Sequence, residues 1–138
     1  MARGAQGWMI GWDTNVLLRL VLGDDVDQMR RVKENLSAFS GEGIRIDRIV
    51  LVEFVWVLRR VYRLDRAEIA QLLERIMTTP GLEFDTRGAV MIAIRRYRNG
   101  PADFADYLIV VLNEMAGATM TYTFDKRAAD TPGFAEVE

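Results

Sequence analysis

The sequence predicts an α/β fold with a central, mostly parallel sheet of four to five strands and helices on both faces of the sheet. Short apolar segments alternate along the chain with longer segments in which apolar residues recur at helical spacing, and this alternation is typical of a parallel sheet. Half of the 138 residues are hydrophobic, which is enough for a single core. We therefore expect one domain over residues 9–138, and we interpret residues 1–8 as an N-terminal extension.

In the first half of the chain, a short apolar strand is expected over residues 9–12, followed directly by an apolar helix over 14–22. A glycine and two aspartates end that helix and cap the next one, which spans 26–39 with apolar residues at helical spacing. A second strand, with the alternating pattern Ile-Arg-Ile, is expected at 44–46. The apolar segment 48–62 is too long for a strand and predicts a mostly buried helix.

In the second half, Asp65 and Glu68 have the spacing of a capping box and predict a helix that runs to Thr78. A glycine or proline follows each helix of this half and marks its end. Two further helices are expected over residues 88–98 and 103–115. Three short strands are expected over residues 82–84, 118–124 and 134–137.

The chain contains no cysteine and no histidine. The absence of cysteine excludes disulfides, thiolate metal ligands and cysteine nucleophiles, and a cytoplasmic location is expected. The absence of histidine excludes a Ser-His-Asp triad and a histidine pair that would cleave RNA through its own 2′-hydroxyl group. Carboxylates must therefore carry out the chemistry if the protein is a hydrolase. No apolar segment approaches the roughly 18 residues of a membrane span, so no membrane association is expected.

Two aspartates follow apolar strands at the point where each strand ends. Asp13 follows residues 9–12, and Asp125 follows residues 118–124. Ligands of open α/β sheets bind at this edge, because the carboxyl ends of parallel strands meet there. The alternative is that each aspartate only caps the helix after it, which is a common role of this residue type.

Three further acids lie in or beside apolar segments. Glu53 has apolar neighbours on every side of its predicted helix, so it needs a bound cation or an ion pair with Arg59 or Arg60. Asp103 and Asp106 are three residues apart and share one face of a helix. The helix dipole accounts for Asp103 at the N-terminus, but it does not readily account for Asp106, one turn further in.

Together these acids predict a metal site. Clustered carboxylates repel each other unless a divalent cation lies among them. Oxygen ligands favour Mg²⁺ or Mn²⁺ over Zn²⁺, and such ions activate a water molecule and stabilise charge on a phosphoryl group. The expected catalytic and metal-binding residues are Asp13, Glu53, Asp106 and Asp125, with Asp103 close by.

Four motifs resemble those of PIN domains, in the same order and with similar spacing, and the second motif has the form seen among VapC-type toxins of bacterial toxin–antitoxin pairs. The motifs are Asp-Thr-Asn-Val-Leu at 13–17, Leu-Val-Glu-Phe-Val-Trp-Val-Leu at 51–58, Ala-Asp-Phe-Ala-Asp-Tyr-Leu-Ile at 102–109 and Thr-Phe-Asp at 123–125. The match extends over nearly everything from Met9 to Val137. The departures are Tyr107, where a small residue is usual, and two valines at 110–111, where the family commonly has alanines.

The resemblance implies a PIN-like fold and an Mg²⁺- or Mn²⁺-dependent endoribonuclease that acts on RNA. The acidic positions of the family are matched by Asp13, Glu53, Asp106 and Asp125, and an additional acid of this subgroup by Asp103. Polar residues that hold the acids in place are matched by Thr14, Asn15 and Thr123. The resemblance also implies a homodimer and a cognate antitoxin that blocks the site. We expect an apolar groove along residues 14–39 to receive the antitoxin.

Two clusters of arginines, at 59–63 and 95–98, are candidates for contacts with RNA phosphates, because a net charge of −2 gives no overall attraction for a polyanion. The residues expected to bind RNA are Arg59, Arg95 and Arg96. The alternative is that these arginines lie on ordinary solvated helix faces. Trp12 and Trp56 have rings that can stack on bases, but both lie in apolar segments that favour packing in the core.

Other functions remain compatible with the sequence. An aspartyl phosphatase or phosphotransferase would use an aspartate nucleophile after the first strand, with Lys126 to steady the phosphoryl group. A catalytically inactive PIN-fold binding protein would not need the complete acidic set. A nuclease of this fold that prefers DNA is a further alternative. For a ribonuclease without histidine, the expected nucleophile is water, which leaves a 5′-phosphate and a 3′-hydroxyl.

Overall fold

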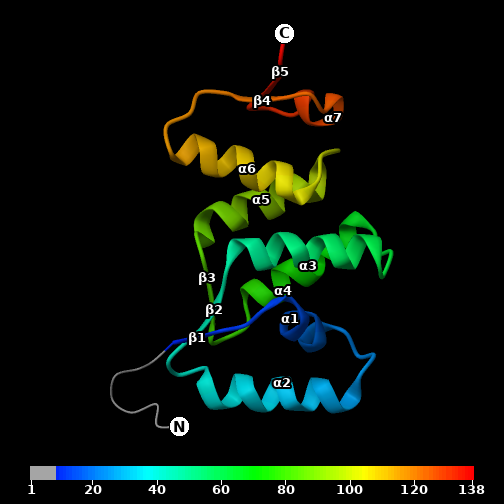
Figure 1. Ribbon diagram of the computed structural model, residues 1–138, viewed down its shortest axis with the longest axis vertical. Coiled ribbons are helices and arrows are strands. Elements are labelled where there is room, and N and C mark those ends of the chain that lie inside the picture. Colours follow the sequence, from blue (N-terminus) through cyan, green and yellow to red (C-terminus); the bar gives the residue numbers. More distant parts are fainter. Residues whose placement is uncertain (1–8) are drawn as a thin grey trace.

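The computed structural model describes residues 9–138 and has an α/β fold (Figure 1), as expected. Residues 1–8, interpreted above as an extension, lie outside the described residues. The helices are α1 (Thr14–Val21), α2 (Val26–Phe39), α3 (Arg48–Arg60), α4 (Arg66–Met77), α5 (Arg87–Asn99), α6 (Phe104–Met115) and α7 (Lys126–Ala129). The strands are β1 (Ile10–Gly11), β2 (Ile44–Ile46), β3 (Leu82–Phe84), β4 (Thr121–Thr123) and β5 (Phe134–Glu136). Every element expected from the sequence is present, and the short helix α7 is an addition to them.

Side-chain caps determine where several helices begin. The capping box expected at α4 is confirmed: the Glu68 N–H donates to Asp65 Oδ1 at 2.8 Å, and the Asp65 N–H donates to Glu68 Oε1 at 3.1 Å. The Ile49 N–H donates to Asp47 Oδ1 at 2.7 Å at the start of α3. Each such cap stabilises its helix by about 1 kcal/mol, so local sequence is sufficient to start these helices.

The strands are parallel, as expected, but they form two sheets and not the single central sheet of four to five strands. The first sheet has the order β1-β2-β3, with Ile44 of β2 aligned with Ile10 on one side and Leu82 on the other. The second sheet is the pair β4-β5, with Thr121 aligned with Phe134. The expected fold class and the parallel direction of the strands are confirmed, and the five strands divide into one sheet of three and one of two.

The two sheets lie on different sides of α6. Figure 1 shows β4, β5 and α7 beyond α6 at one end of the molecule, whereas β1 lies on the opposite side of α3 and α4. The Asn113 side chain of α6 donates to Thr121 Oγ1 at 3.0 Å, and the Thr121 N–H donates to the Gly133 carbonyl at 2.9 Å. These bonds tie β4 to α6 and β5. Consequently, within residues 9–138, β1 has a strand neighbour on one side only.

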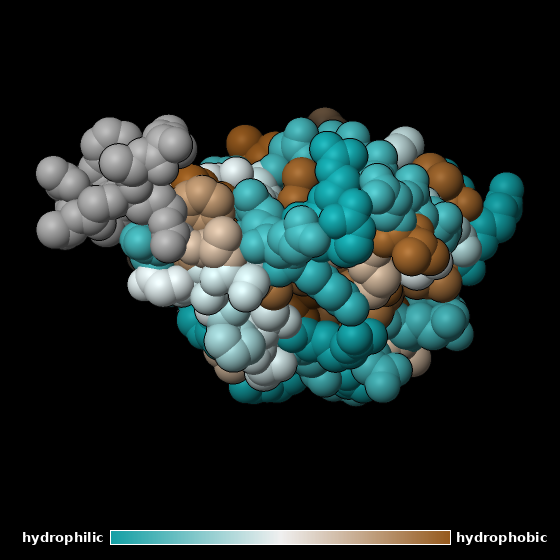
Figure 2. Space-filling model, turned by 90° about the horizontal axis from the view of Figure 1, so that it is seen from below, coloured by the Kyte–Doolittle hydropathy of each residue, from teal (hydrophilic) through white to brown (hydrophobic). Residues whose placement is uncertain are grey.

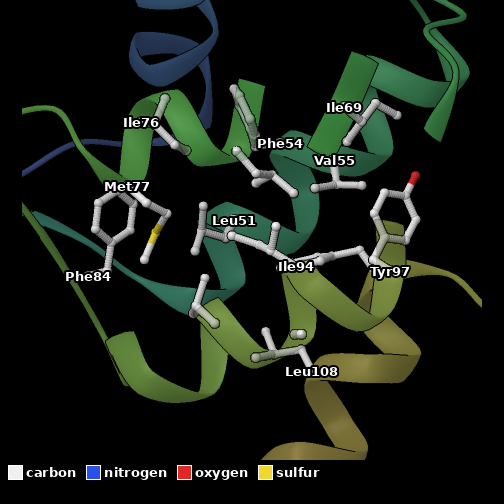
Figure 3. Close-up of a cluster of buried hydrophobic side chains, with 14 of the residues drawn as sticks. Leu51, Phe54, Val55, Ile69, Ile76, Met77, Phe84, Ile94, Tyr97 and Leu108 are labelled. Carbon is white, nitrogen blue, oxygen red and sulfur yellow. The ribbon is translucent and has the colours of Figure 1, made fainter. Parts of the chain in front are cut away.

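Buried side chains from α3 to α6 form the core that holds the candidate site. Leu51 and Phe54 of α3 are fully buried. Figure 3 shows both side chains in one cluster with Ile94 of α5 and Leu108 of α6. Truncation of a buried side chain of this size typically costs about 2–5 kcal/mol. The core therefore fixes α3 and α6 relative to each other.

Arg66 of α4 forms hydrogen bonds with the end of α5 and with the loop between α5 and α6. Its guanidinium donates to the carbonyl oxygens of Tyr97 at 2.9 Å, Ala102 at 2.7 Å and Pro101 at 3.1 Å. The Arg66 Cζ atom also lies 4.4 Å from the centroid of the Tyr97 ring, in a cation–π contact. Because α6 begins directly after this loop, Arg66 helps to place the acids at the start of α6.

The surface around α2 is only partly apolar. Figure 2 views the molecule from this side and shows a mostly hydrophilic surface with separate apolar patches. A groove of about 440 Å³ lies between β1, α1 and α2, and its lining mixes apolar Val16 and Val32 with polar residues such as Gln28. Trp12 is buried at this groove and donates to Asn35 Oδ1 at 2.8 Å, so its expected packing in the core is confirmed. No helix of the described residues is long and apolar enough to cross a membrane.

Candidate active site

Asp103 is the N-cap residue of α6 and Asp106 lies in its first turn, so the two acids share the start of this helix, as expected. The Asp103 N–H donates to Asp106 Oδ2 at 3.2 Å, and this bond caps the helix. Asp103 Oδ1 is buried without a hydrogen bond and lies 3.4 Å from Nη1 of Arg59. This oxygen forms an ion pair with Arg59 but accepts no hydrogen bond, so it keeps lone pairs that a ligand or a cation can use.

Burial raises the pKa of the Asp106 carboxyl group above its ordinary value. The hydrogen bond from the Asp103 N–H opposes this rise in pKa, and the negative charges of Asp103 and Asp125 add to it. The positive charge of Arg127 lowers the Asp106 pKa again. The charges of Asp103 and Asp125 therefore act on Asp106 where α6 and α7 begin, and a bound cation would relieve this repulsion.

Asp13 and Asp125 both cap the helix that follows, which is the alternative that the sequence left open. Asp13 Oδ1 accepts from the N–H groups of Asn15 at 3.1 Å and Val16 at 3.4 Å. Asp125 Oδ1 accepts from the Arg127 N–H at 2.9 Å. In both residues Oδ2 has no hydrogen bond to another described residue. Capping thus leaves one oxygen of each carboxylate for a ligand.

The residues expected to support the acids lie next to them. Thr123 Oγ1 accepts from the Asp125 N–H at 3.0 Å and so orients the backbone of this aspartate. Thr14 is buried at the start of α1. Asn15 contacts Asp13 through its backbone N–H, while its side chain is exposed.

Glu53 is exposed, contrary to the burial expected from its apolar neighbours. In α3, Leu51, Phe54 and Val55 point into the core, so Glu53 lies on the outer face of the same helix. The alternative ion pair of Glu53 with an arginine is also absent from residues 9–138, and Arg59 lies beside Asp103 instead. A nearly uniform apolar segment does not reveal which face of its helix is buried, and for this reason the expectation was wrong.

The four acids expected to share a metal ion do not converge in this structure. No group of three or more acidic side chains within residues 9–138 is arranged to hold a metal ion. Asp13 follows β1 in the first sheet, whereas Asp125 follows β4 in the second, so the split of the sheet separates them. The acids of α6 and α7 are chemically suited to a divalent cation, but the described arrangement does not complete a metal site.

A pocket of about 400 Å³ lies between the C-terminal end of α3 and the start of α6. We call it the arginine pocket, because its charged lining consists of Arg59, Arg60, Arg63, Arg127 and Asp103. The remainder of its lining is Val52, Val55, Trp56, Tyr97, Phe104 and Ala105. Since Asp103 forms part of its wall, the arginine pocket adjoins the acids at the start of α6.

Of the three arginines expected to bind RNA, Arg59 lines the arginine pocket and the other two do not. Arg96 lies 3.4 Å from Glu114 Oε1, and Arg95 is exposed on α5. Arg127 also lines the pocket and was not among the arginines expected to bind RNA; its position two residues after Asp125 was the available signal. Trp56 is 56% exposed at the same pocket, so its expected packing in the core was wrong.

This arrangement of parallel strands, with acids after β1 and β4 and at the start of α6, agrees with the match of residues 12–133 to the PIN domain. The chain belongs to the PIN domain family, as the four motifs indicated. It is similar to a VapC ribonuclease of Aquifex aeolicus (strain VF5), with 26% identity over 117 residues. This alignment covers 83% of the chain and 86% of that protein.

Proposed function

We propose that this chain is an endoribonuclease that hydrolyses RNA phosphodiester bonds and acts as the toxin of a toxin–antitoxin pair. The observation that carries the proposal is that Asp103 forms part of the wall of the arginine pocket, while the charges of Asp103 and Asp125 act on the neighbouring Asp106. A phosphodiester needs positive groups to hold its charge and acids, with a cation, to act on the reacting atoms. Membership in the PIN family and similarity to a VapC ribonuclease support the same function.

Cleavage by the purified protein tests this function. Single-stranded RNA and DNA of the same sequence would be incubated with Mg²⁺, with Mn²⁺ or with EDTA. We expect cleavage of RNA with either metal and none in EDTA. Asp106→Asn should lower the rate by at least about 100-fold, since catalytic acids contribute on the order of 10²–10⁴. Asp27→Asn, an exposed acid of α2, is the matched control. Equal cleavage by both variants would contradict the proposal.

The proposed cofactor is Mg²⁺ or Mn²⁺, with Asp13, Glu53, Asp106 and Asp125 as ligands. When bound, the ion would supply an activated water molecule and stabilise charge on the phosphoryl group. Because the described arrangement separates these acids, the proposal requires β4 and α7 to approach β1. Two observations support such an approach. β1 has an edge without a strand neighbour in the described part of the chain, and Tyr122 and Phe124 at β4 are 67% and 79% exposed.

Spin labels can measure this approach, because the chain has no native cysteine. Met9→Cys and Tyr122→Cys introduce one label beside β1 and one on β4, both at exposed positions. We expect the distance between the labels to shorten when Mg²⁺ is added, and Asp106→Asn to prevent the shortening. Metal binding, measured by calorimetry, without any change in this distance would contradict the proposed ligand set.

The separated acids favour a second candidate, a catalytically inactive PIN-fold binding protein. This candidate predicts binding of RNA or of a protein without cleavage in any metal. The cleavage assay above therefore decides between the two candidates. No observation favours an aspartyl phosphotransferase. This enzyme would need Lys126 beside Asp13, but Lys126 begins α7 after β4 of the second sheet, whereas Asp13 follows β1 of the first sheet.

We also propose that the protein is a cytoplasmic homodimer and that a cognate antitoxin covers its site in the cell. The similarity to a VapC ribonuclease supports these partners. The groove between β1, α1 and α2 is a candidate surface for the antitoxin, since apolar Ile10, Val16 and Val32 line it. Sedimentation of the protein alone would measure whether it is a dimer, and sedimentation with the antitoxin would measure whether the two proteins form a complex.

A further inference from the structure

We propose that the arginine pocket binds one nucleotide of a single-stranded RNA, with Trp56 stacking on its base and the arginines holding the adjoining phosphates. This inference deepens the proposed function and rests on it, because it assigns a substrate-binding subsite to the same nuclease. The end of α3 forms one part of the wall of this pocket. Asp103, at the start of α6, forms another part.

Trp56 is a large aromatic side chain that remains 56% exposed in a folded domain. Arg59 and Arg60 follow it by three and four residues in α3, so the three side chains share one face of the helix. All three line the arginine pocket. An exposed ring beside guanidinium groups suits a nucleotide, because bases stack on aromatic rings while phosphates pair with arginines.

The charge of the pocket favours an anionic occupant. Its lining contains four arginines and one aspartate. Arg59 lies near Asp103, but the guanidinium groups of Arg60 and Arg63 have no ion pair or hydrogen bond within residues 9–138. The chain as a whole carries a net charge of −2, so this excess of positive charge is local. A phosphodiester backbone would neutralise it and release counterions.

Arg63 has a backbone conformation that favours glycine. Its φ angle is +56°, in the left-handed region, which side chains with a Cβ atom adopt at a cost. Arg63 follows the last turn of α3, where a glycine would be free of this strain. An arginine at this position therefore stabilises the fold less than a glycine would. Its side chain can instead contribute positive charge that binds an anion.

The size and position of the pocket favour a single strand. A volume of about 400 Å³ is comparable to pockets for small ligands and suits one nucleotide. Bases inside a duplex are already stacked on their neighbours, so their faces are not available to Trp56. Asp103 forms part of the wall, and Asp106 caps the same turn. A nucleotide in the pocket would thus place its adjoining phosphate next to the acids.

Tryptophan fluorescence in EDTA tests the inference without cleavage. The probe is a hexamer of adenylate RNA, and its affinity is measured from the quenching of Trp56. We expect Trp56→Leu to abolish the quenching and to weaken binding, measured by anisotropy of labelled RNA, by roughly 5- to 150-fold, the range for loss of one stacked base. Trp56→Phe should restore most of the affinity. Because Trp56 is exposed, circular dichroism should show that both variants remain folded.

Variants of the arginines test the phosphate contacts. Arg63→Gly should weaken RNA binding and reduce the salt dependence of log K by about 0.7, the value for one phosphate contact with a single strand. The same variant should melt at a higher temperature than the wild type, because it relieves the left-handed backbone. Arg75→Ala removes one exposed arginine of α4 outside the pocket and should change neither RNA binding nor the melting temperature. Thr86→Gly relieves the other left-handed residue, at φ +52°, and should change stability only.

Three competitors identify the occupant. An abasic hexamer with the same phosphates should bind at least about 5-fold more weakly than the adenylate hexamer, and a blunt RNA duplex should not quench Trp56. A hexaglutamate peptide should not compete. If hexaglutamate competes as well as RNA does, the pocket is a site for an acidic protein segment and the inference is overturned. Equal affinities of the wild type and of Trp56→Leu for the adenylate hexamer would also overturn it. If the wild type cleaves RNA and Trp56→Leu binds RNA as tightly as the wild type, the subsite is refuted and the proposed enzyme is not. Specific binding without cleavage in any metal would refute the proposed enzyme and leave the subsite in place.

Discussion

Replacement of Arg66 by alanine should destabilise the domain and disturb the candidate site together. Two of the bonds from Arg66, to the carbonyls of Tyr97 and Ala102, involve partners that are almost fully buried. Bonds to a charged donor contribute about 1.5–3 kcal/mol each, and the cation–π contact adds about 0.5–1 kcal/mol. The half-buried guanidinium is partly solvated and its bonds are not additive, so we expect a loss of about 3 kcal/mol.

For a domain of this size, a loss of about 3 kcal/mol lowers the melting temperature by roughly 6–15 °C. Thermal and urea unfolding, followed by circular dichroism, measure this loss. Arg66→Lys should lose about half as much, because an ammonium group cannot donate to three carbonyls in the fork geometry of a guanidinium. Arg75→Ala, in the same helix, is the control and should change the melting temperature by less than about 2 °C. A melting temperature of Arg66→Ala that matches this control would refute the role given to Arg66.

Four further outcomes are expected. Burial and neighbouring charges raise the pKa of Asp106 in the folded state, so in EDTA the folded protein loses stability as the pH rises through that pKa. Asp106→Asn should therefore be more stable than wild type at neutral pH, and the difference in melting temperature should vanish at pH values below the unfolded-state pKa. Asp103→Asn should reduce RNA cleavage less than Asp106→Asn, as initial rates would show. End-group analysis of the cleaved RNA should find 5′-phosphates, and a 2′,3′-cyclic phosphate formed by wild type but not by Asp13→Asn would contradict a water nucleophile. Expression without an antitoxin should slow growth or give poorly soluble protein, whereas healthy cells with soluble, active protein would contradict an obligate partner.

The candidate site was only partly predictable. The sequence indicated Asp103 and Asp106 on one helix face, and the structure has Asp103 at the N-cap and Asp106 in the first turn of α6. It did not reveal that Glu53 is exposed, because every neighbour of Glu53 in the helix sequence is apolar. It also did not reveal the arginine pocket. Arg127 is more than 60 residues from Arg63 in the chain, and only the packing of α6 and α7 near the end of α3 brings them to one pocket.

The sequence by itself determined the order and type of the elements, the parallel direction of the strands and the position of each acid relative to its strand or helix. These features depend on periodicity, caps and turns, which involve residues close together in the chain. The tertiary structure decided which strands are neighbours, which face of α3 is buried and which charges meet. Those features depend on contacts between distant segments. β4 pairs with β5 and is hydrogen-bonded to α6, and the core of α3 to α6 leaves Trp56 and the arginines beside it on the surface.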